Sequence, residues 1–453
     1  MKTVRLLFMT VICVSAFALG WRCQTDLAVG MDVCWHSPDC MEPLLQEDNG
    51  MTAQANTQQA PGDLDVGFAD NGMINIPQGS SQCVVETSAG KLLYVAQTGR
   101  VSWVYRAMAD GTSDPTFQPF AWDFAKGQFE SFTRLLARRD GKFLLIGNSG
   151  NEPFIRQAAI TRFNEGGSPD LVFGTKMLPL PVDPVPPEQG LQTFGPTGCL
   201  TADNHVLVAA SYQLADSEGT TIDSAGRVYT LDDQGHPDTG FEVRFKGPIT
   251  TIHSIGVLSD GRIVVFGIVD RPASGTSVPN AVLACYNRDG TLNKTFGIDG
   301  FWEDKSYAGF GSMVVDDDKI IIAAVTSINN DGNRYVSVQR VLGDGTSDKT
   351  FNNGAPLVVD LGSGFINIPS ITVQPDKKIV VAGSENFPVQ NLYWLRTTEG
   401  GELDTSFGDS GVVRQQAGRV NDIIVQRTGN RLILAVNLDS SEAQGPKVLG
   451  ILS

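Results

Sequence analysis

The sequence predicts an all-β fold, a seven-bladed β-propeller with four antiparallel strands in each blade. Three observations lead to this prediction: a sevenfold repeat, tight hairpin turns within the repeats, and an unpartnered strand at each end of the array. A repeat with a period of tens of residues marks one supersecondary unit that is copied many times. Four short strands per unit, repeated around an axis, are the plan of a β-propeller.

The repeat is the pattern Gly-x-x-Asp/Asn-x-x-Phe. The Asp or Asn positions of successive copies lie 49, 56, 68, 55, 55 and 56 residues apart. The seven copies are Gly62/Asp65/Phe68, Gly111/Asp114/Phe117, Gly167/Asp170/Phe173, Gly235/Asp238/Phe241, Gly290/Asn293/Phe296, Gly345/Asp348/Phe351 and Gly401/Asp404/Phe407. Seven near-identical sites are an unlikely design for one active centre, so the repeat predicts a structural part.

Each residue type of the motif has a mechanical role. Glycine reaches backbone conformations closed to other residues, and an Asp side chain accepts hydrogen bonds from the backbone two residues on. The Phe ring is expected to fill the space between blades. An arginine stands five residues before the glycine in four copies, where we expect it to pair with the motif Asp: Arg106, Arg162, Arg340 and Arg396.

Two copies depart from this pairing. In the fifth, Cys285 replaces the arginine and Asn293 replaces the aspartate together, as a charge pair would allow. In the fourth, Thr230 replaces the arginine while Asp238 is kept. The pairing hypothesis is therefore half supported by the sequence alone.

The segments between the motifs supply the other strands. A typical unit has a hairpin from Ile371–Gln374 to Ile379–Ala382 and a third strand at Leu392–Arg396. Turns such as Asp140-Gly141 favour two-residue hairpins because these residues tolerate positive φ. A short fourth strand follows each motif. A β-solenoid is the alternative architecture, but the repeats of β-solenoids usually contain shorter turns and lack two-residue hairpins.

The ends of the array predict that the ring is closed. The first motif is followed by a strand, Met73–Ile76, with no earlier hairpin to join, and the chain stops after a third strand at Lys447–Leu452. The N-terminal strand can complete the last blade. Closure of this kind removes exposed strand edges that otherwise invite aggregation.

The hairpin SITVQPDKKIVVAGS, the third strand NLYWLRTTEGG and the turn GELDTSFGDSGVV together resemble the delta-60 repeat, a family of bacterial propeller-like repeats. The resemblance covers about residues 62–453. It implies an exported bacterial protein, and it implies no known catalytic residues.

The N-terminus predicts export. Lys2 and Arg5 precede an apolar run from Leu6 to Leu19, and Ala16 and Ala18 supply small residues for cleavage after residue 18. The apolar run is too short to span a bilayer comfortably, so we expect no integral membrane protein. The predicted organisation is a signal peptide at 1–18, a Cys-rich segment at 19–45, a linker at 46–61 and the propeller at 62–453.

Cysteine usage agrees with an oxidising compartment. Six cysteines would remain after cleavage, and Cys23, Cys34 and Cys40 crowd into one short stretch that reads as a disulfide-stapled segment. A metal site formed by these three with His36 is the alternative, but the spacing matches no zinc pattern. With three cysteines in the stretch, one must pair elsewhere or stay free.

Catalytic groups are scarce in this sequence. It has four histidines, of which His36, His205 and His236 lie in the Cys-rich segment or in turns, and His253 is the one expected to face a central channel. We predict no cofactor, although calcium could be held by Asp316-Asp317-Asp318 or by the run from Asn329 to Asn333. The net charge of −16 argues against nucleic-acid binding.

The third unit is stretched by two insertions, a proline-rich loop at Leu178–Gly190 and a polar loop at Leu214–Arg227. Long loops on a rigid scaffold often carry binding sites. The sequence therefore favours an exported, monomeric binding module for a protein or glycan, at these loops or at one end of the central funnel. The alternatives are a propeller enzyme (hydrolase, lyase or oxidoreductase) acting from the channel and a structural surface protein without a discrete ligand.

Overall fold

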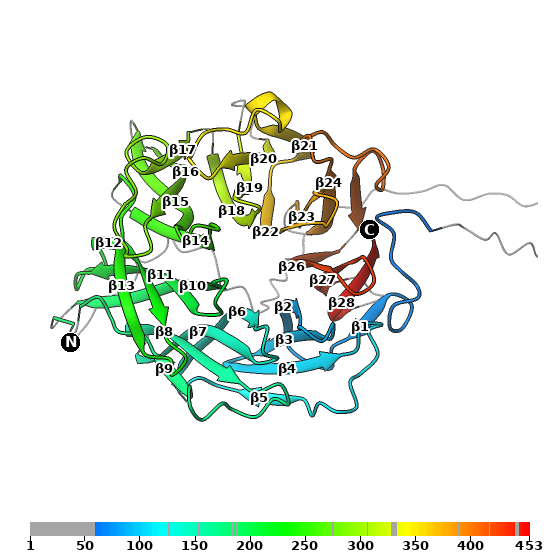
Figure 1. Cartoon of the computed structure of the whole chain (residues 1–453), viewed down its shortest axis with the longest axis horizontal. Coiled ribbons are helices and arrows are strands. Elements are labelled where there is room, and N and C mark those ends of the chain that lie inside the picture. Colours follow the sequence, from blue (N-terminus) through cyan, green and yellow to red (C-terminus); the bar gives the residue numbers. More distant parts are fainter. Residues whose placement is uncertain are drawn as a thin grey trace, which may run out of the picture. The chain divides into compact units, whose positions relative to one another are not determined.

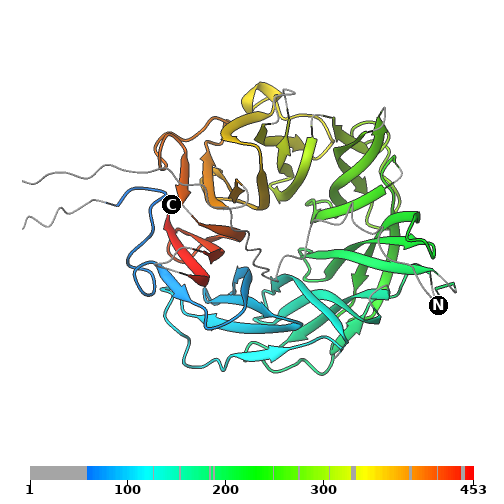
Figure 2. The same ribbon diagram turned by 180° about the vertical axis from the view of Figure 1, so that it is seen from behind.

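A computed structural model describes residues 59–453 except 126, 153–154, 183–184, 187–188, 248, 274–275, 306, 328–332, 387–389, 416 and 440–443. The described residues form a ring of seven blades, each of four antiparallel strands, as predicted (Figure 1). Figure 2 shows the ring from behind. The predicted signal peptide and Cys-rich segment lie outside the described residues, as does most of the predicted linker.

In each blade the strands follow the chain from the centre of the ring outward, and blade 7 takes its outermost strand from the N-terminal side. Blade 1 consists of β2 (Ser80–Glu86), β3 (Leu92–Thr98), β4 (Val101–Ala107) and β5 (Phe120–Trp122). Blade 2 consists of β6 (Phe129–Ala137), β7 (Phe143–Glu152), β8 (Ile155–Phe163) and β9 (Thr175–Met177). Blade 3 consists of β10 (Gly190–Leu200), β11 (Val206–Ala215), β12 (Thr221–Leu231) and β13 (Pro237–Val243).

The remaining blades have the same plan. Blade 4 consists of β14 (Ile249–Val257), β15 (Ile263–Ala273), β16 (Thr276–Tyr286) and β17 (Phe301–Asp304). Blade 5 consists of β18 (Tyr307–Asp316), β19 (Lys319–Thr326), β20 (Arg334–Leu342) and β21 (Leu357–Ser363), with a 3-10 turn η1 (Asn352–Gly354) before β21. Blade 6 consists of β22 (Ile366–Val373), β23 (Ile379–Glu385), β24 (Asn391–Thr397) and β25 (Val412–Gln415). Blade 7 consists of β26 (Gly418–Gln426), β27 (Arg431–Leu438), β28 (Gly445–Leu452) and β1 (Met73–Asn75).

The predicted closure of the ring is confirmed. Strand β1 pairs antiparallel with β28, with Met73 opposite Leu449 and Asn75 opposite Lys447. The amide of Gly62 also donates to the carbonyl of Leu452 at 2.8 Å, so the pairing extends past the strand itself. The first and last described segments therefore share one sheet, blue beside red in Figure 1.

The core is divided among the interfaces between neighbouring blades. One cluster, for example, joins Val336 and Phe351 of blade 5 to Ile371 and Val381 of blade 6. The motif phenylalanines fill these interfaces: Phe68, Phe117, Phe173, Phe296, Phe351 and Phe407 are all at most 5% exposed. Burial of an aromatic ring contributes roughly 2 to 3 kcal/mol, so this repeated residue is a main source of blade-to-blade stability.

The fourth motif differs from the prediction of a turn followed by a strand. Pro237 to Val243 run directly as β13, with Phe241 opposite Val228, so the outer strand contains the motif itself. The connection explains the difference, because β14 begins at Ile249 and leaves too few residues for a turn and a separate strand. Phe241 is only partly buried, and its ring lies 4.8 Å from that of Tyr286.

The predicted polar loop at Leu214–Arg227 is also wrong in most of its length. Strands β11 and β12 continue through it, with Tyr212 opposite Ala225 and Leu214 opposite Asp223. Only a short turn remains, closed by the amide of Asp216 on the carbonyl of Thr220 at 3.0 Å. The insertion therefore lengthens a hairpin, because antiparallel pairing satisfies backbone groups that a loop would leave to water.

Candidate functional site

The motif turns are mechanical parts, as their residue types predict. All seven motif glycines have positive φ, between 77° and 100°. In six motifs the Asp or Asn Oδ1 accepts a hydrogen bond from the amide two residues on, for example from Thr116 to Asp114 at 2.9 Å. These side chains are occupied in holding the bend.

The predicted arginine–aspartate pairs are present in all four units that contain both residues. The Nε–Oδ2 distances are 2.6, 2.7, 2.7 and 2.8 Å for Arg106–Asp114, Arg162–Asp170, Arg340–Asp348 and Arg396–Asp404. Each guanidinium also lies 4.3 to 5.0 Å from the centroid of the motif Phe ring. In three of the four units a second bond reaches the next blade, as from Arg340 Nη1 to the carbonyl of Glu399 at 2.8 Å. The arginine thus couples neighbouring blades.

The exception at Cys285 has a compensating residue on another strand. Cys285 lies opposite Val264, as Arg396 lies opposite Val380, so the two occupy equivalent places. In blade 4 the guanidinium comes instead from Arg262, whose Nη1 donates to the carbonyl of Gly343 at 2.7 Å and lies 4.0 Å from Cys285 Sγ. The hydrogen bond to the next blade is therefore kept, but the arginine that donates it lies just before β15 instead of on the third strand.

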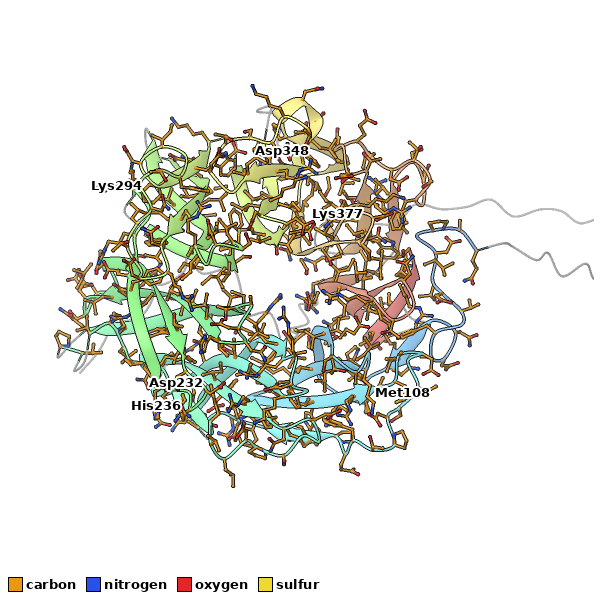
Figure 3. The ribbon with its side chains drawn as sticks, viewed as in Figure 1. Met108, Asp232, His236, Lys294, Asp348 and Lys377 are labelled. Carbon is orange, nitrogen blue, oxygen red and sulfur yellow. The ribbon has the colours of Figure 1, made fainter. Side chains whose placement is uncertain are left out.

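The described histidines have local partners. His253 lies on the innermost strand β14, where its Nδ1 is 3.2 Å from the carbonyl of Gly311 and its ring meets Phe266 edge-on. Burial lowers the pKa of His253 to about 4, so its ring is neutral. His205 and His236 are exposed beside Asp203 and Asp232, and Figure 3 shows the second pair at the outer edge of blade 3.

The acidic run Asp316-Asp317-Asp318 forms the turn between β18 and β19. Its carboxylates bind neighbouring blades: Lys377 Nζ lies 2.9 Å from Asp316 and 2.6 Å from Asp317, and the amide of Ser259 donates to Asp318 at 2.6 Å. Lys377 is labelled in Figure 3. The described residues include no cluster of three His, Cys, Asp or Glu side chains arranged for a metal. Residues 329–332 of the other run lie outside the described structure, so the prediction of no cofactor and its calcium alternative both stay untested.

Three cysteines of the propeller are free thiols: Cys83, Cys199 and Cys285. Burial raises the pKa of Cys199 to about 12 and that of Cys285 to about 11, and it raises the pKa of Cys83 well above its usual value. These thiols are protonated at neutral pH and poor nucleophiles. The predicted disulfide candidates Cys23, Cys34 and Cys40 and the ligand candidate His36 lie outside the described residues.

The proline-rich insertion covers a small pocket between blades 2 and 3. Leu178 is buried, its amide donates to the carbonyl of Ala158 at 2.8 Å, and Tyr229 donates its hydroxyl hydrogen bond to the carbonyl of Pro179. Leu180 and Val185 pack on Leu191 and its neighbours. The insertion is therefore held against the blade rather than standing free.

This pocket combines apolar walls with one unsatisfied cationic group. It is lined by residues 178–181 of the insertion, by Tyr212 and Tyr229, and by Arg227. The Nε of Arg227 is buried and has no hydrogen-bond partner within the described structure, and its guanidinium lies 5.5 Å from the Tyr229 ring. The enclosed space is only about 10 Å³, room for one water or one small group. A larger ligand could place only a terminal group there.

A second polar group lies on the innermost strands of blades 6, 7, 1 and 2. The carboxylate of Asp422 accepts from Ser370 Oγ at 2.8 Å, from the amide of Ile423 at 3.0 Å and from the amide of Val84 at 3.2 Å. Arg134 Nη1 is 3.9 Å from the same carboxylate. Sequence reasoning missed Arg227, Arg134 and Asp422, because isolated charges within apolar strand runs carry no motif.

The fold places this chain in the β-propeller class, and a search of protein families agrees. The family described as "Domain of unknown function (DUF5122) beta-propeller" matches residues 258–296 and 374–407. Both segments begin at a hairpin turn and end at a motif phenylalanine, Phe296 or Phe407. No curated protein matches the chain.

Solved structures show similarity at low identity. A protein of unknown function from Dyadobacter fermentans is 11% identical, with a TM-score of 0.41, and the match covers 71% of this chain and 94% of that one. A mutant NanB sialidase from Streptococcus pneumoniae is 6% identical with a TM-score of 0.44 and coverages of 87% and 92%. Acylaminoacyl peptidase from Pyrococcus horikoshii is 10% identical with a TM-score of 0.37, and the match covers 69% of this chain and 44% of the peptidase. Within the described residues, no helix is long and apolar enough to cross a membrane.

Proposed function

We propose that this chain is an exported β-propeller of the delta-60 repeat type that works as a binding module for a protein or a glycan, with its ligand site on blade 3. The N-terminal pattern of Lys2, the apolar run to Leu19 and Ala16/Ala18 supports export. The family match supports the repeat type, because its two segments start and stop where the sequence repeat does.

The observation that carries the proposal is the buried, unpartnered Nε of Arg227 beneath the proline-rich insertion. A buried donor without a partner is unfavourable by about 1 to 3 kcal/mol, so such a group is retained where a ligand can satisfy it. Tyr212 and Tyr229 line the same pocket with buried aromatic rings, and Tyr is a residue type enriched in recognition sites. A carbonyl or carboxylate oxygen at the end of a larger ligand fits the small enclosed space.

The alternative of an enzyme acting from the channel stays a prediction, as does that of a surface protein with no ligand. The geometry favours binding, because Arg227 is the one charged side chain that lines the blade-3 pocket and no carboxylate or histidine lines it. An acid–base mechanism would need two converging titratable groups.

The test uses the full chain on arrays of defined glycans and defined peptides, followed by affinity measurement of each hit. Arg227→Met keeps the aliphatic stem on Tyr229 and removes the charge, so we expect affinity to fall at least tenfold. Arg288→Met is the matched control, since the Arg288 side chain is 78% exposed and lies in blade 4. Unchanged affinity of Arg227→Met, or the absence of any defined hit, would overturn the proposal.

A further inference from the structure

A second site of a different kind lies at the axis of the ring, on Arg134. Arg134 belongs to β6, the innermost strand of blade 2, which faces the centre of the ring in Figure 1. It is the first residue after a bulge, where the register with β7 shifts between Phe132 and Arg134. Bulges re-aim side chains and are frequent beside functional sites.

The equivalent residues of blades 4 and 7, Ser254 and Asp422, have a structural task. They also follow a bulge on the innermost strand, and their side chains bind the free backbone edge of the next blade. Ser254 Oγ accepts from the amide of Met313 at 3.3 Å, and Asp422 accepts from the amide of Val84 at 3.2 Å. A guanidinium has only donors. Arg134 therefore cannot accept a hydrogen bond from a backbone amide of the next blade. Its presence at this position needs another explanation.

Arg134 is also not held as the arginines of the third strands are. Arg106, Arg162 and Arg340 each donate at least three hydrogen bonds, to a motif aspartate and to the following blade. Within the described structure Arg134 makes no hydrogen bond, and its buried Nε has no partner. Its side chain is 44% exposed, although it lies on the innermost strand, so solvent reaches the group.

The nearest anion leaves this cation unsatisfied. Asp422 lies 3.9 Å from Nη1, beyond hydrogen-bond distance, and its oxygens already accept three hydrogen bonds. Cys83 lies between the two on blade 1 as a protonated thiol, because burial raises its pKa. The guanidinium thus keeps free donors directed at solvent, with its charge only partly offset.

We infer that Arg134 is an axial recognition site for a small monocarboxylate. The planar guanidinium forms two parallel hydrogen bonds with a carboxylate, which is the strongest pairing open to it. Asp422 beside it and the net charge of −16 disfavour ligands with several negative charges.

The experiment is calorimetric titration of the full chain with glucuronate and with glucose, which differ at one carboxylate. We expect saturable binding of glucuronate and none of glucose. Arg134→Met should weaken glucuronate binding at least tenfold, while Arg288→Met and Arg227→Met should leave it within twofold. The second of these controls separates the axial site from the blade-3 site of the proposed function.

A folding defect is controlled by a conservative variant. Arg134→Lys keeps the charge but cannot form the two parallel hydrogen bonds, so it should fold like the wild type, by melting temperature, and bind glucuronate several-fold more weakly. The inference is overturned if glucuronate gives no saturable signal, if glucose binds equally well, or if Arg134→Met or Arg134→Lys binds as the wild type does.

Discussion

The Nε of Arg431 donates a 2.6 Å hydrogen bond to the carboxylate of Asp65, although 366 residues separate them. The same guanidinium lies 5.0 Å from the centroid of Phe68, and its Nη1 donates to the carbonyl of Ala109 in blade 1 at 3.3 Å. Arg431 occupies the start of β27, as Arg262 occupies the position just before β15. The usual arginine position on the third strand is here Gly450, where a Cβ would lie 2.6 Å from the Phe68 ring. Arg431, which links the two ends of the ring, therefore occupies the same displaced position in blade 7 as Arg262 does in blade 4.

Substitution of Arg431 should weaken the closure of the ring. Arg431→Met leaves Asp65 without its cation, and we expect a loss of about 2 kcal/mol in the free energy of unfolding, since hydrogen bonds to charged groups contribute about 1.5 to 3 kcal/mol each. Urea denaturation followed by circular dichroism measures it. Arg288→Met removes an exposed pair with Asp203 and should change stability by less than about 0.5 kcal/mol. Equal effects of the two variants would contradict a closing role for Arg431.

Much of this scaffold follows from local chemistry and could be predicted. The glycine, aspartate and phenylalanine of each motif act through contacts within a few residues, and the unpartnered ends of the array required closure. The displaced arginines were harder to predict, because Arg431 reaches its motif, and Arg262 the following blade, from a different strand than Arg396 does. A sequence pattern records position along the chain, whereas a guanidinium on a long side chain can serve the same site from either of two neighbouring strands.

The exchange in blade 4 predicts a coupled set of substitutions. Cys285→Arg alone places a second guanidinium beside that of Arg262, whose Nη1 is 4.0 Å from Cys285 Sγ, and should destabilise the protein by about 2 to 3 kcal/mol through overpacking and repulsion. The triple variant Arg262→Lys, Cys285→Arg, Asn293→Asp recreates the arrangement of blade 6, where Lys378 and Arg396 share Asp404. It should recover most of the loss.

Melting temperatures of the single and triple variants measure this coupling. Asn293→Asp in the otherwise unchanged chain is the control, because it adds the acceptor without moving the arginine. If the triple variant is no more stable than Cys285→Arg alone, the two positions are not exchangeable and the equivalence of Arg262 with the third-strand arginines is wrong.

Thiol counting tests the predicted N-terminal disulfide. Six cysteines remain after cleavage at residue 18, and one disulfide among Cys23, Cys34 and Cys40 would leave four reactive thiols in denaturant without reductant. In the native state the propeller thiols should react slowly, because burial raises the pKa of each. Six reactive thiols in denatured, exported protein would end the disulfide hypothesis.

The candidate binding groups were beyond sequence reasoning for a physical reason. The proline-rich insertion was found because it lengthens one repeat, but its packing on Leu191 and Tyr212 depends on how the strands that follow it pair. Arg134 and Asp422 come from blades at opposite ends of the chain and are brought to 3.9 Å only when the ring closes. Predicting their proximity would require the bulge positions of the innermost strands, which depend on pairing with the second strands.

Acid should destabilise the blades through their motif aspartates, and Asp170 makes the test quantitative. Burial alone would raise the pKa of Asp170, but hydrogen bonds from Lys142, the Val172 amide and Arg162 outweigh it and lower the pKa from 3.8 to about 2. A carboxyl group with a lower pKa in the folded state stabilises the protein above the unfolded pKa, and that contribution is lost as pH falls through the folded value. The shift corresponds to about 2 kcal/mol of folding stability, which is lost between about pH 4 and pH 2.

Urea unfolding measured from pH 5 to pH 2 should therefore show Asp170→Asn losing less stability than the wild type by about this amount. Asp299→Asn, at a side chain 78% exposed, should run parallel to the wild type. An Asp170→Asn profile parallel to the wild type as well would show that the ion pairs with Lys142 and Arg162 do not set the acid limit of the ring.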